Sequence, residues 1–76
     1  MDKNNFINLL TTTLADLIQL EPMYSRLNVS PATLIEKNRK LIDNNYDPED
    51  YEYALYQIVD IIDKQLSDSV DGSLYK

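Results

Sequence analysis

The segment from Asp47 to Leu66, DPEDYEYALYQIVDIIDKQL, constrains the fold more than any other part of the chain. Asp47 is a suitable helix N-cap, because its carboxylate can accept hydrogen bonds from the free backbone N–H groups of a first turn. Pro48 would then occupy the first helical position, where its missing N–H costs nothing. These residues predict a helix over 47–66.

The apolar side chains of this segment fall within an arc of about 160° when they are placed at 100° per residue. The members of this stripe are Tyr51, Ala54, Leu55, Ile58, Val59, Ile61, Ile62 and Leu66. The arc is wider than a coiled-coil seam, so we expect the helix to contact more than one neighbour. A second stripe, over roughly half the circumference, predicts a helix over 3–20. Its members are Phe6, Ile7, Leu9, Leu10, Leu14, Leu17, Ile18 and Leu20.

Three prolines mark the remaining boundaries. Pro22 ends the first helix and opens a short one over 22–27. The Ser30–Pro31 pair repeats the cap-and-proline signal and predicts a helix over 31–44. The predicted fold class is therefore all-α, a small bundle of three main helices plus one short helix. The helices over 31–44 and 47–66 are expected to form an antiparallel hairpin.

The chain has 76 residues, which is the length of one domain. We predict a helical domain over residues 1–66 and a flexible C-terminal tail over 67–76, a polar segment that contains the single glycine. Cysteine and histidine are absent from the sequence, which excludes disulfides, zinc fingers and catalysis by either side chain. No apolar run is long enough to span a membrane, and the first ten residues do not resemble a signal peptide. A cytoplasmic location is expected.

The two wide apolar stripes are difficult to cover within so short a chain. We therefore expect a homodimer, or a stable hetero-partner, with the 3–20 or the 47–66 helix at the seam. Asn38 falls on the apolar face of the 31–44 helix. One interpretation is a polar group that sets the register of such a seam. The other interpretation, given more weight, is a position at the rim of the stripe.

The segment LNVSPATLIEKNRKL resembles the turn and second helix of helix-turn-helix DNA-binding domains. In that family an apolar turn precedes a recognition helix that lies in the major groove. The resemblance implies that residues 22–41 form the motif of a transcriptional regulator. It also implies that Thr33, Glu36, Lys37 and Lys40 contact DNA.

The same segment departs from the helix-turn-helix pattern in three places. Tyr24 stands where a small residue normally lets the two helices cross closely. Asn28 replaces the turn glycine, which is tolerable because asparagine accepts positive φ, and Asn38 falls on the inward face. The net charge of −6 also opposes binding to phosphates. DNA binding is therefore the alternative function, and a capped structural helix is the simpler interpretation.

We considered two candidate sites for metal or catalytic chemistry and reject both, the first on its spacing and the second on its expected exposure to water. Asp43, Asn45 and Asp47 match the first three ligands of an EF-hand loop, but Pro48 and Ala54 stand where that loop needs Gly and Glu. Asp60 and Asp63 are expected on the outer surface of the 47–66 helix, where water leaves carboxylates untuned for acid–base catalysis. We therefore expect no enzyme activity, no cofactor and no bound metal.

The remaining candidate is an aromatic and acidic surface on the 47–66 helix. Tyr53 and Tyr56 point away from the apolar stripe, in a surround of carboxylates that includes Glu52, Asp60 and Asp63. Tyrosine offers a large contact area with a polar tip, and it is favoured at protein interfaces. Negative charge around it would accelerate association with a basic partner. The competing interpretation is that both rings lie flat over the edge of the bundle.

Together these patterns predict a small, acidic, non-enzymatic regulatory or inhibitory protein that acts by binding another protein. The scale of the chain is typical of accessory proteins of bacteria, plasmids and phages. A third interpretation, a protein similar to bacteriocin-immunity proteins, has only the small helical build in its favour.

Overall fold

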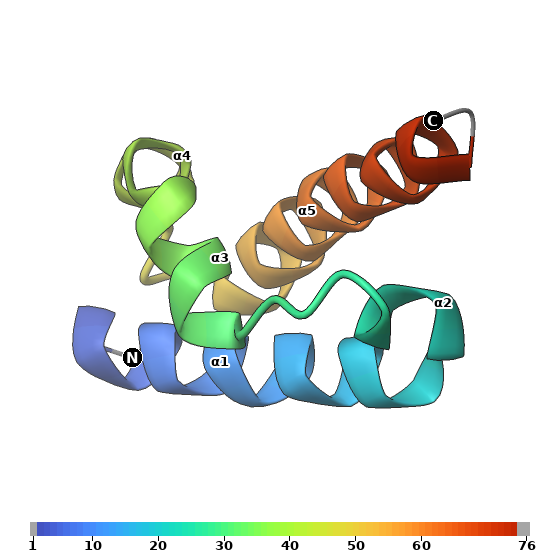
Figure 1. The fold of residues 1–76 in the computed structure, drawn as a ribbon. Coiled ribbons are helices and arrows are strands. Elements are labelled where there is room, and N and C mark those ends of the chain that lie inside the picture. The colour runs from blue at the N-terminus through green and yellow to red at the C-terminus, as the bar shows by residue number, and fades with distance from the viewer. Residues whose placement is uncertain (1, 75–76) are drawn as a thin grey trace.

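The computed structural model describes residues 2–74, with side chains described through residue 70. The described residues form helices and no strand, which confirms the all-α class. The elements are α1 (Lys3–Leu20), α2 (Pro22–Ser25), α3 (Pro31–Lys37), α4 (Arg39–Asn45) and α5 (Tyr51–Leu74). Figure 1 shows α1 along one edge, α2 at the end of α1, α3 and α4 beside the start of α5, and α5 leading away.

Helix α1 has the predicted bounds. Asp2 caps it, because a carboxylate oxygen of Asp2 accepts from the backbone N–H of Asn5 at 2.8 Å. Three consecutive threonines in the middle of α1 each donate a side-chain hydroxyl to the carbonyl oxygen four residues earlier, at distances of 2.7, 3.1 and 2.9 Å. These bonds keep the β-branched run within the helix, although such residues lower helix propensity.

The turn between α2 and α3 also follows the sequence signals. Asn28 has a φ of 54°, the left-handed conformation that asparagine tolerates better than most residues. Ser30 then caps α3, because its hydroxyl oxygen accepts from the backbone N–H of Thr33 at 3.2 Å, with Pro31 at the first helical position.

The predicted helix over 31–44 is instead two helices that meet at Asn38, and this corrects the sequence analysis. Asn38 has φ −108° and ψ 22°, outside the helical region. Its backbone N–H bonds to the carbonyls of Leu34 and Ile35, while its own carbonyl accepts from the N–H of Ile42 at 3.0 Å and opens α4. One residue therefore ends α3 and starts α4, which changes the helix direction.

The side chain of Asn38 explains why the break is stable. Asn38 is buried, so the interpretation that placed it at the rim of the apolar stripe is wrong. Its amide nitrogen donates to the carbonyl of Leu34 at 2.9 Å, and its amide oxygen accepts from Nε2 of Gln65 at 2.9 Å. Both groups are therefore satisfied within the chain, as burial requires. The bond to Gln65 ties the break to α5.

The start of α5 also differs from the prediction. Asp47 and Pro48 do not open the helix, which begins at Tyr51. Asp47 instead accepts from the backbone N–H of Glu49 at 2.9 Å, a side-chain turn. Asp50 takes the capping position, because its carboxylate and its carbonyl accept from the first turn of α5 at 3.4 and 3.2 Å.

The C-terminal end of α5 runs further than expected, to Leu74. It therefore passes through most of the segment that was predicted as a tail, and Val70 packs against the core. Residues 75 and 76 lie outside the described part of the chain, as do the side chains of residues 71–74. The division into residues 1–66 and 67–76 stays a prediction, as does the antiparallel hairpin.

The core lies where α1 and α5 face each other and α2, α3 and α4 close the sides. Its fully buried side chains are Phe6, Leu10, Leu14, Ile42, Ile58 and Ile62. The chain by itself covers most of both apolar stripes. In α1 only Leu9 and Leu20 of the predicted stripe are exposed, and in α5 only Ile61. A second subunit is therefore needed less than the sequence indicated, although the dimer stays a prediction.

An ion pair joins the first turn of α1 to α4. The ammonium group of Lys3 contacts a carboxylate oxygen of Asp43, and Arg39 lies 3.7 Å from the same oxygen. The hydrogen bond from Lys3 and the two positive charges hold the pKa of Asp43 below its ordinary value. A lowered pKa in the folded state means that this pair stabilises the fold at neutral pH. The effect is lost as the pH falls through that lowered value.

We expect the substitution Asn38→Ala to lower the free energy of unfolding by about 1–3 kcal/mol, because it leaves the part-buried amide nitrogen of Gln65 without its partner. Asn45→Ala is the matched control. Asn45 makes the same amide bond to a carbonyl four residues earlier, also at 2.9 Å, but it is exposed. The control should change stability by no more than about 0.5 kcal/mol. Urea denaturation measures both variants, and equal losses would contradict a special role for the buried amide.

Candidate protein-binding surface

The outer side of α5 carries the two most exposed aromatic side chains of the described structure. Tyr53 is 62% exposed and Tyr56 is 67% exposed. The competing interpretation, in which both rings lie flat over the bundle edge, is difficult to reconcile with these fractions. The spacing of three residues places them on one side of the helix, because Ala54, Leu55 and Ile58 turn inward. Together with Glu52 and Asp60, both exposed, they form what we call the tyrosine face.

Local contacts hold part of the tyrosine face in place. The phenol oxygen of Tyr53 accepts a hydrogen bond from Nε2 of Gln57 at 2.9 Å, one turn further along α5. Asp60 pairs with Lys64 at 3.2 Å, and both side chains are largely exposed. Such a pair contributes little stability, so water or a partner can displace it at small cost.

Asp63 does not belong with the tyrosine face. Its side chain is half-buried, and its carboxylate accepts a hydrogen bond from the phenol of Tyr24 at 2.5 Å. Tyr24 is itself buried, with 6% of its surface exposed. This bond joins α2 to α5 across 39 residues of sequence. The residue that departed from the helix-turn-helix pattern through its size therefore packs in the core and positions Asp63.

The residues of the DNA-binding alternative lie on two different helices. Thr33, Glu36 and Lys37 are in α3 and Lys40 is in α4, with the break at Asn38 between them. All four are exposed. The hydroxyl of Thr33 lies 2.9 Å from the hydroxyl of Ser30 and takes part in the cap of α3.

The helix that would precede the recognition helix, α2, has only four residues, and α3 has seven. Both are shorter than a typical globular helix of roughly 8–20 residues. The split also separates Lys37 from Lys40, which the single predicted helix would have carried one turn apart.

The carboxylates that matched an EF-hand in sequence are engaged elsewhere. Asp43 pairs with Lys3, and Asp47 forms the turn with Glu49. Within the described residues, no three acidic side chains come together in an arrangement that could hold a metal ion. In the same part of the chain, none of the helices combines the length and hydrophobicity that a membrane span requires.

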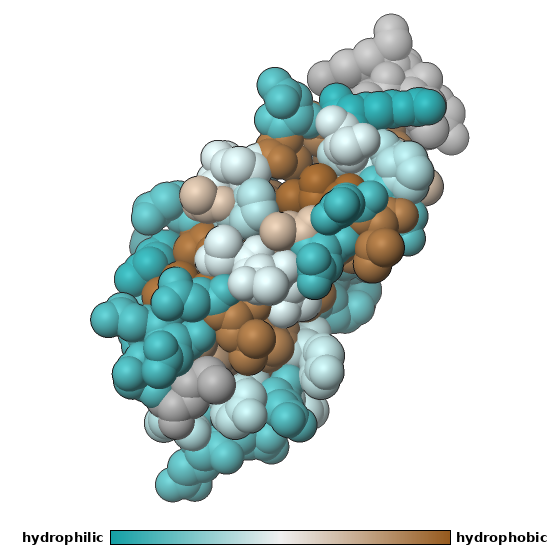
Figure 2. Space-filling view, turned by 90° about the horizontal axis from the view of Figure 1, so that it is seen from below, coloured by the Kyte–Doolittle hydropathy of each residue, from teal (hydrophilic) through white to brown (hydrophobic). Residues whose placement is uncertain are grey.

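Apolar side chains are also exposed away from the tyrosine face. Leu20, at the end of α1, is 78% exposed, and Met23 in α2 is 46% exposed. Figure 2 views the molecule from the α1 side and shows apolar atoms in separate groups with polar atoms between them. A continuous apolar patch is the usual sign of an obligate interface, and this face does not present one.

Comparisons with protein-family models, with curated proteins and with solved structures found no match for this chain. A functional proposal therefore depends on the exposed residues themselves. Of the predicted protein-binding residues, the structure brings four together on the outer side of α5 and turns Asp63 toward α2.

We expect the substitution Tyr24→Phe to lower the free energy of unfolding by about 1–2 kcal/mol, because it removes a part-buried hydrogen bond to a carboxylate. Tyr56→Phe removes the same atom from an exposed ring and serves as the control, with an expected change within about 0.5 kcal/mol. Thermal or urea denaturation checks both. If the two variants are equally stable, the bond between Tyr24 and Asp63 does not hold α2 against α5.

Proposed function

We propose that this protein is a small non-enzymatic regulator or inhibitor that binds a basic surface of another protein through the tyrosine face of α5. The observation that carries the proposal is the pair Tyr53 and Tyr56, which are exposed by about two-thirds on a side of the helix that the core does not need. When a partner covers large rings that were exposed to water, the free energy falls and the complex is stabilised. Tyrosine is also enriched among the residues that dominate binding energy.

The charge of the chain supports a basic partner. The sequence carries 13 acidic and 7 basic residues, and Glu52 and Asp60 lie beside the exposed rings. Opposite charge on a partner would raise the association rate and favour the correct orientation, and added salt would weaken this effect. We place this activity in the cytoplasm, in a bacterial, plasmid or phage setting. The same negative charge makes the DNA-binding alternative the weaker one, because phosphate contacts need a positive surface.

The double substitution Tyr53→Ala with Tyr56→Ala should weaken partner binding by at least ~2 kcal/mol, a ~30-fold loss, while the fold is retained because neither ring is in the core. The partner is first identified by affinity capture from the native host with mass spectrometry. Binding of the purified partner is then measured by calorimetry. The double substitution Asn44→Ala with Asn45→Ala changes two exposed side chains of α4, outside the tyrosine face, and is the matched control.

Unchanged binding by the tyrosine variant would contradict the proposal, as would an equal loss in the control. The same affinity capture also tests the DNA-binding alternative. If the captured material is nucleic acid, and if Lys37→Glu with Lys40→Glu abolishes its binding, residues 22–41 are the functional segment.

The predicted homodimer is part of this proposal and has a separate test. The exposed pair Leu20 and Met23 offers the best seam that α1 and α2 provide, because two apolar side chains there lack cover. Light scattering at micromolar concentration should give twice the chain mass of 8.8 kDa. Leu20→Glu with Met23→Glu should reduce it to one chain, because charge at the seam is costly to bury. A mass near 8.8 kDa for the unaltered protein would contradict the dimer.

A further inference from the structure

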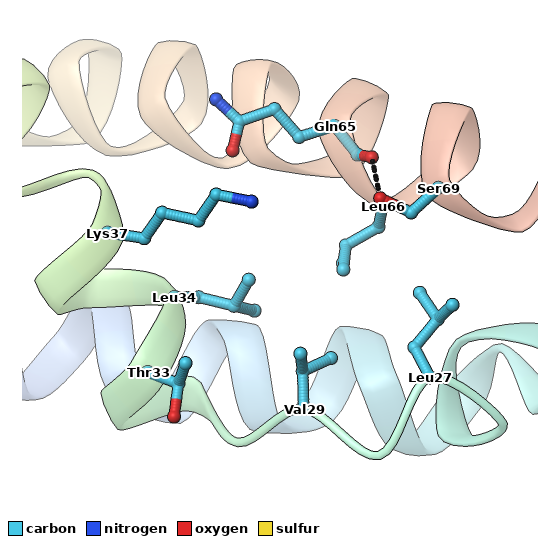
Figure 3. A pocket seen from close by; sticks show the side chains of 8 residues that line it. All are labelled: Leu27, Val29, Thr33, Leu34, Lys37, Gln65, Leu66 and Ser69. Atoms are coloured by element: carbon cyan, nitrogen blue, oxygen red, sulfur yellow. Dashed lines mark hydrogen bonds between the residues drawn. The ribbon is translucent and has the colours of Figure 1, made fainter. Parts of the chain in front are cut away.

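A hollow of about 280 Å³ lies between α3, the link from α2 to α3, and the C-terminal half of α5. Figure 3 shows the side chains that line it, which come from three separate parts of the chain. Its lining residues are Leu27, Val29, Thr33, Leu34, Lys37, Gln65, Leu66 and Ser69. The residues from α5 lie on a different side of that helix from Tyr53 and Tyr56, so the hollow is separate from the tyrosine face.

The walls of the hollow are mainly apolar. Leu34 and Leu66 are 4% and 3% exposed and form its inner part, while Leu27 and Val29 are partly buried against the core. The described residues that line it include neither aspartate nor glutamate. Of the 13 acidic residues of the chain, those that the structure describes therefore contribute no side chain to this lining. A negatively charged ligand in the hollow would not be repelled by any carboxylate of the described lining residues.

Lys37 supplies a positive charge at this place. Figure 3 shows its side chain extending from the end of α3 toward Leu66 and Gln65, across the mouth of the hollow. Lys3, Arg39 and Lys64 each pair with an aspartate. Lys37 forms no ion pair with any side chain that the structure describes. Its ammonium group is therefore available to an anion whose apolar part occupies the hollow.

Gln65 shows that the polar rim of the hollow is not fully satisfied. Its Nε2 donates to Asn38, but its Oε1 is buried and has no hydrogen-bond partner among the described atoms. An acceptor left without a donor destabilises the fold and favours any rearrangement that brings a donor near. The ammonium group of Lys37 carries three donors, enough to bond a ligand and an amide oxygen together.

We propose that this hollow binds a small apolar monocarboxylate, with its hydrocarbon part against Leu27, Val29 and Leu66 and its carboxylate on Lys37. The volume is roughly twice the ~150 Å³ of an apolar cavity that binds benzene, which fits an acid of about eight to ten carbon atoms. An ammonium–carboxylate bond at the edge of an apolar site fixes the orientation of such a ligand. This ligand site is independent of the proposed contact with a protein partner.

The test uses octanoate as the probe and the full chain labelled with ¹⁵N. Octanoate should shift the backbone amide signals of residues 27–37 and 65–69 in a saturable manner. Octylamine, which has the same chain length and the opposite charge, should bind ~10-fold more weakly or less. Lys37→Met keeps most of the apolar stem and should weaken octanoate ~10-fold. Lys40→Met is the matched control, because Lys40 is exposed, lacks an ion pair within the described residues and does not line the hollow.

Three results from the octanoate, octylamine and lysine-variant measurements would overturn the proposal, and a fourth comes from a variant that fills the hollow. The first three are no saturable shift by millimolar octanoate, equal affinities for octanoate and octylamine, and equal affinities of the two lysine variants for octanoate. The comparison of octanoate with octylamine uses the unaltered protein, so it decides the matter even if Lys37→Met does not fold. Val29→Trp should fill the hollow and abolish the shifts, and unchanged binding in that variant would place the acid elsewhere.

Discussion

The hydrogen bond between the amides of Asn38 and Gln65 is the contact on which the arrangement of the helices depends. It is a polar, part-buried contact at the edge of a core that a chain of this length can make only thin. Because it fixes one residue between α3 and α4 against the middle of α5, it sets the direction in which each of those helices leaves the break. The apolar contacts on both sides, such as Leu34 before it and Ile42 after it, then follow from that geometry. Apolar packing alone would allow more than one arrangement, whereas a pair of amides has few ways to be satisfied.

Local signals predicted the helices well where the responsible residues are neighbours. Ser30 caps the helix it precedes, and Asn28 takes the positive φ that the turn requires. The signals failed where a distant residue decides. No residue near Asn38 in the sequence indicates that Gln65 will donate a hydrogen bond to it. The 31–44 pattern therefore predicted one continuous helix. Asp47 was predicted to cap α5, but its carboxylate bonds to the backbone N–H of Glu49, and Asp50 is the residue that caps the helix.

Local signals likewise predicted some features of the candidate protein-binding surface and missed others. Helical spacing alone placed Tyr53 and Tyr56 on the outer side of α5, because the opposite residues are plainly apolar. The same spacing gave Asp63 a similar position, but a carboxylate at the edge of a stripe can face a neighbour as readily as water. Only the position of α2 shows that it faces Tyr24. The hollow beside Lys37 could not be predicted at all, since residues from three parts of the chain form it and no local pattern marks it.

The three bonded threonines of α1 have a consequence for how this helix meets water. Each hydroxyl of Thr11, Thr12 and Thr13 has already given its one hydrogen to a carbonyl of the preceding turn. What remains of each side chain for other contacts is a methyl group and the lone pairs of the hydroxyl oxygen. The middle of α1 is therefore less strongly hydrated than three hydroxyl side chains would normally make it. A surface that covered this turn would leave no threonine donor without a partner, so only the acceptor oxygens would lose contact with water.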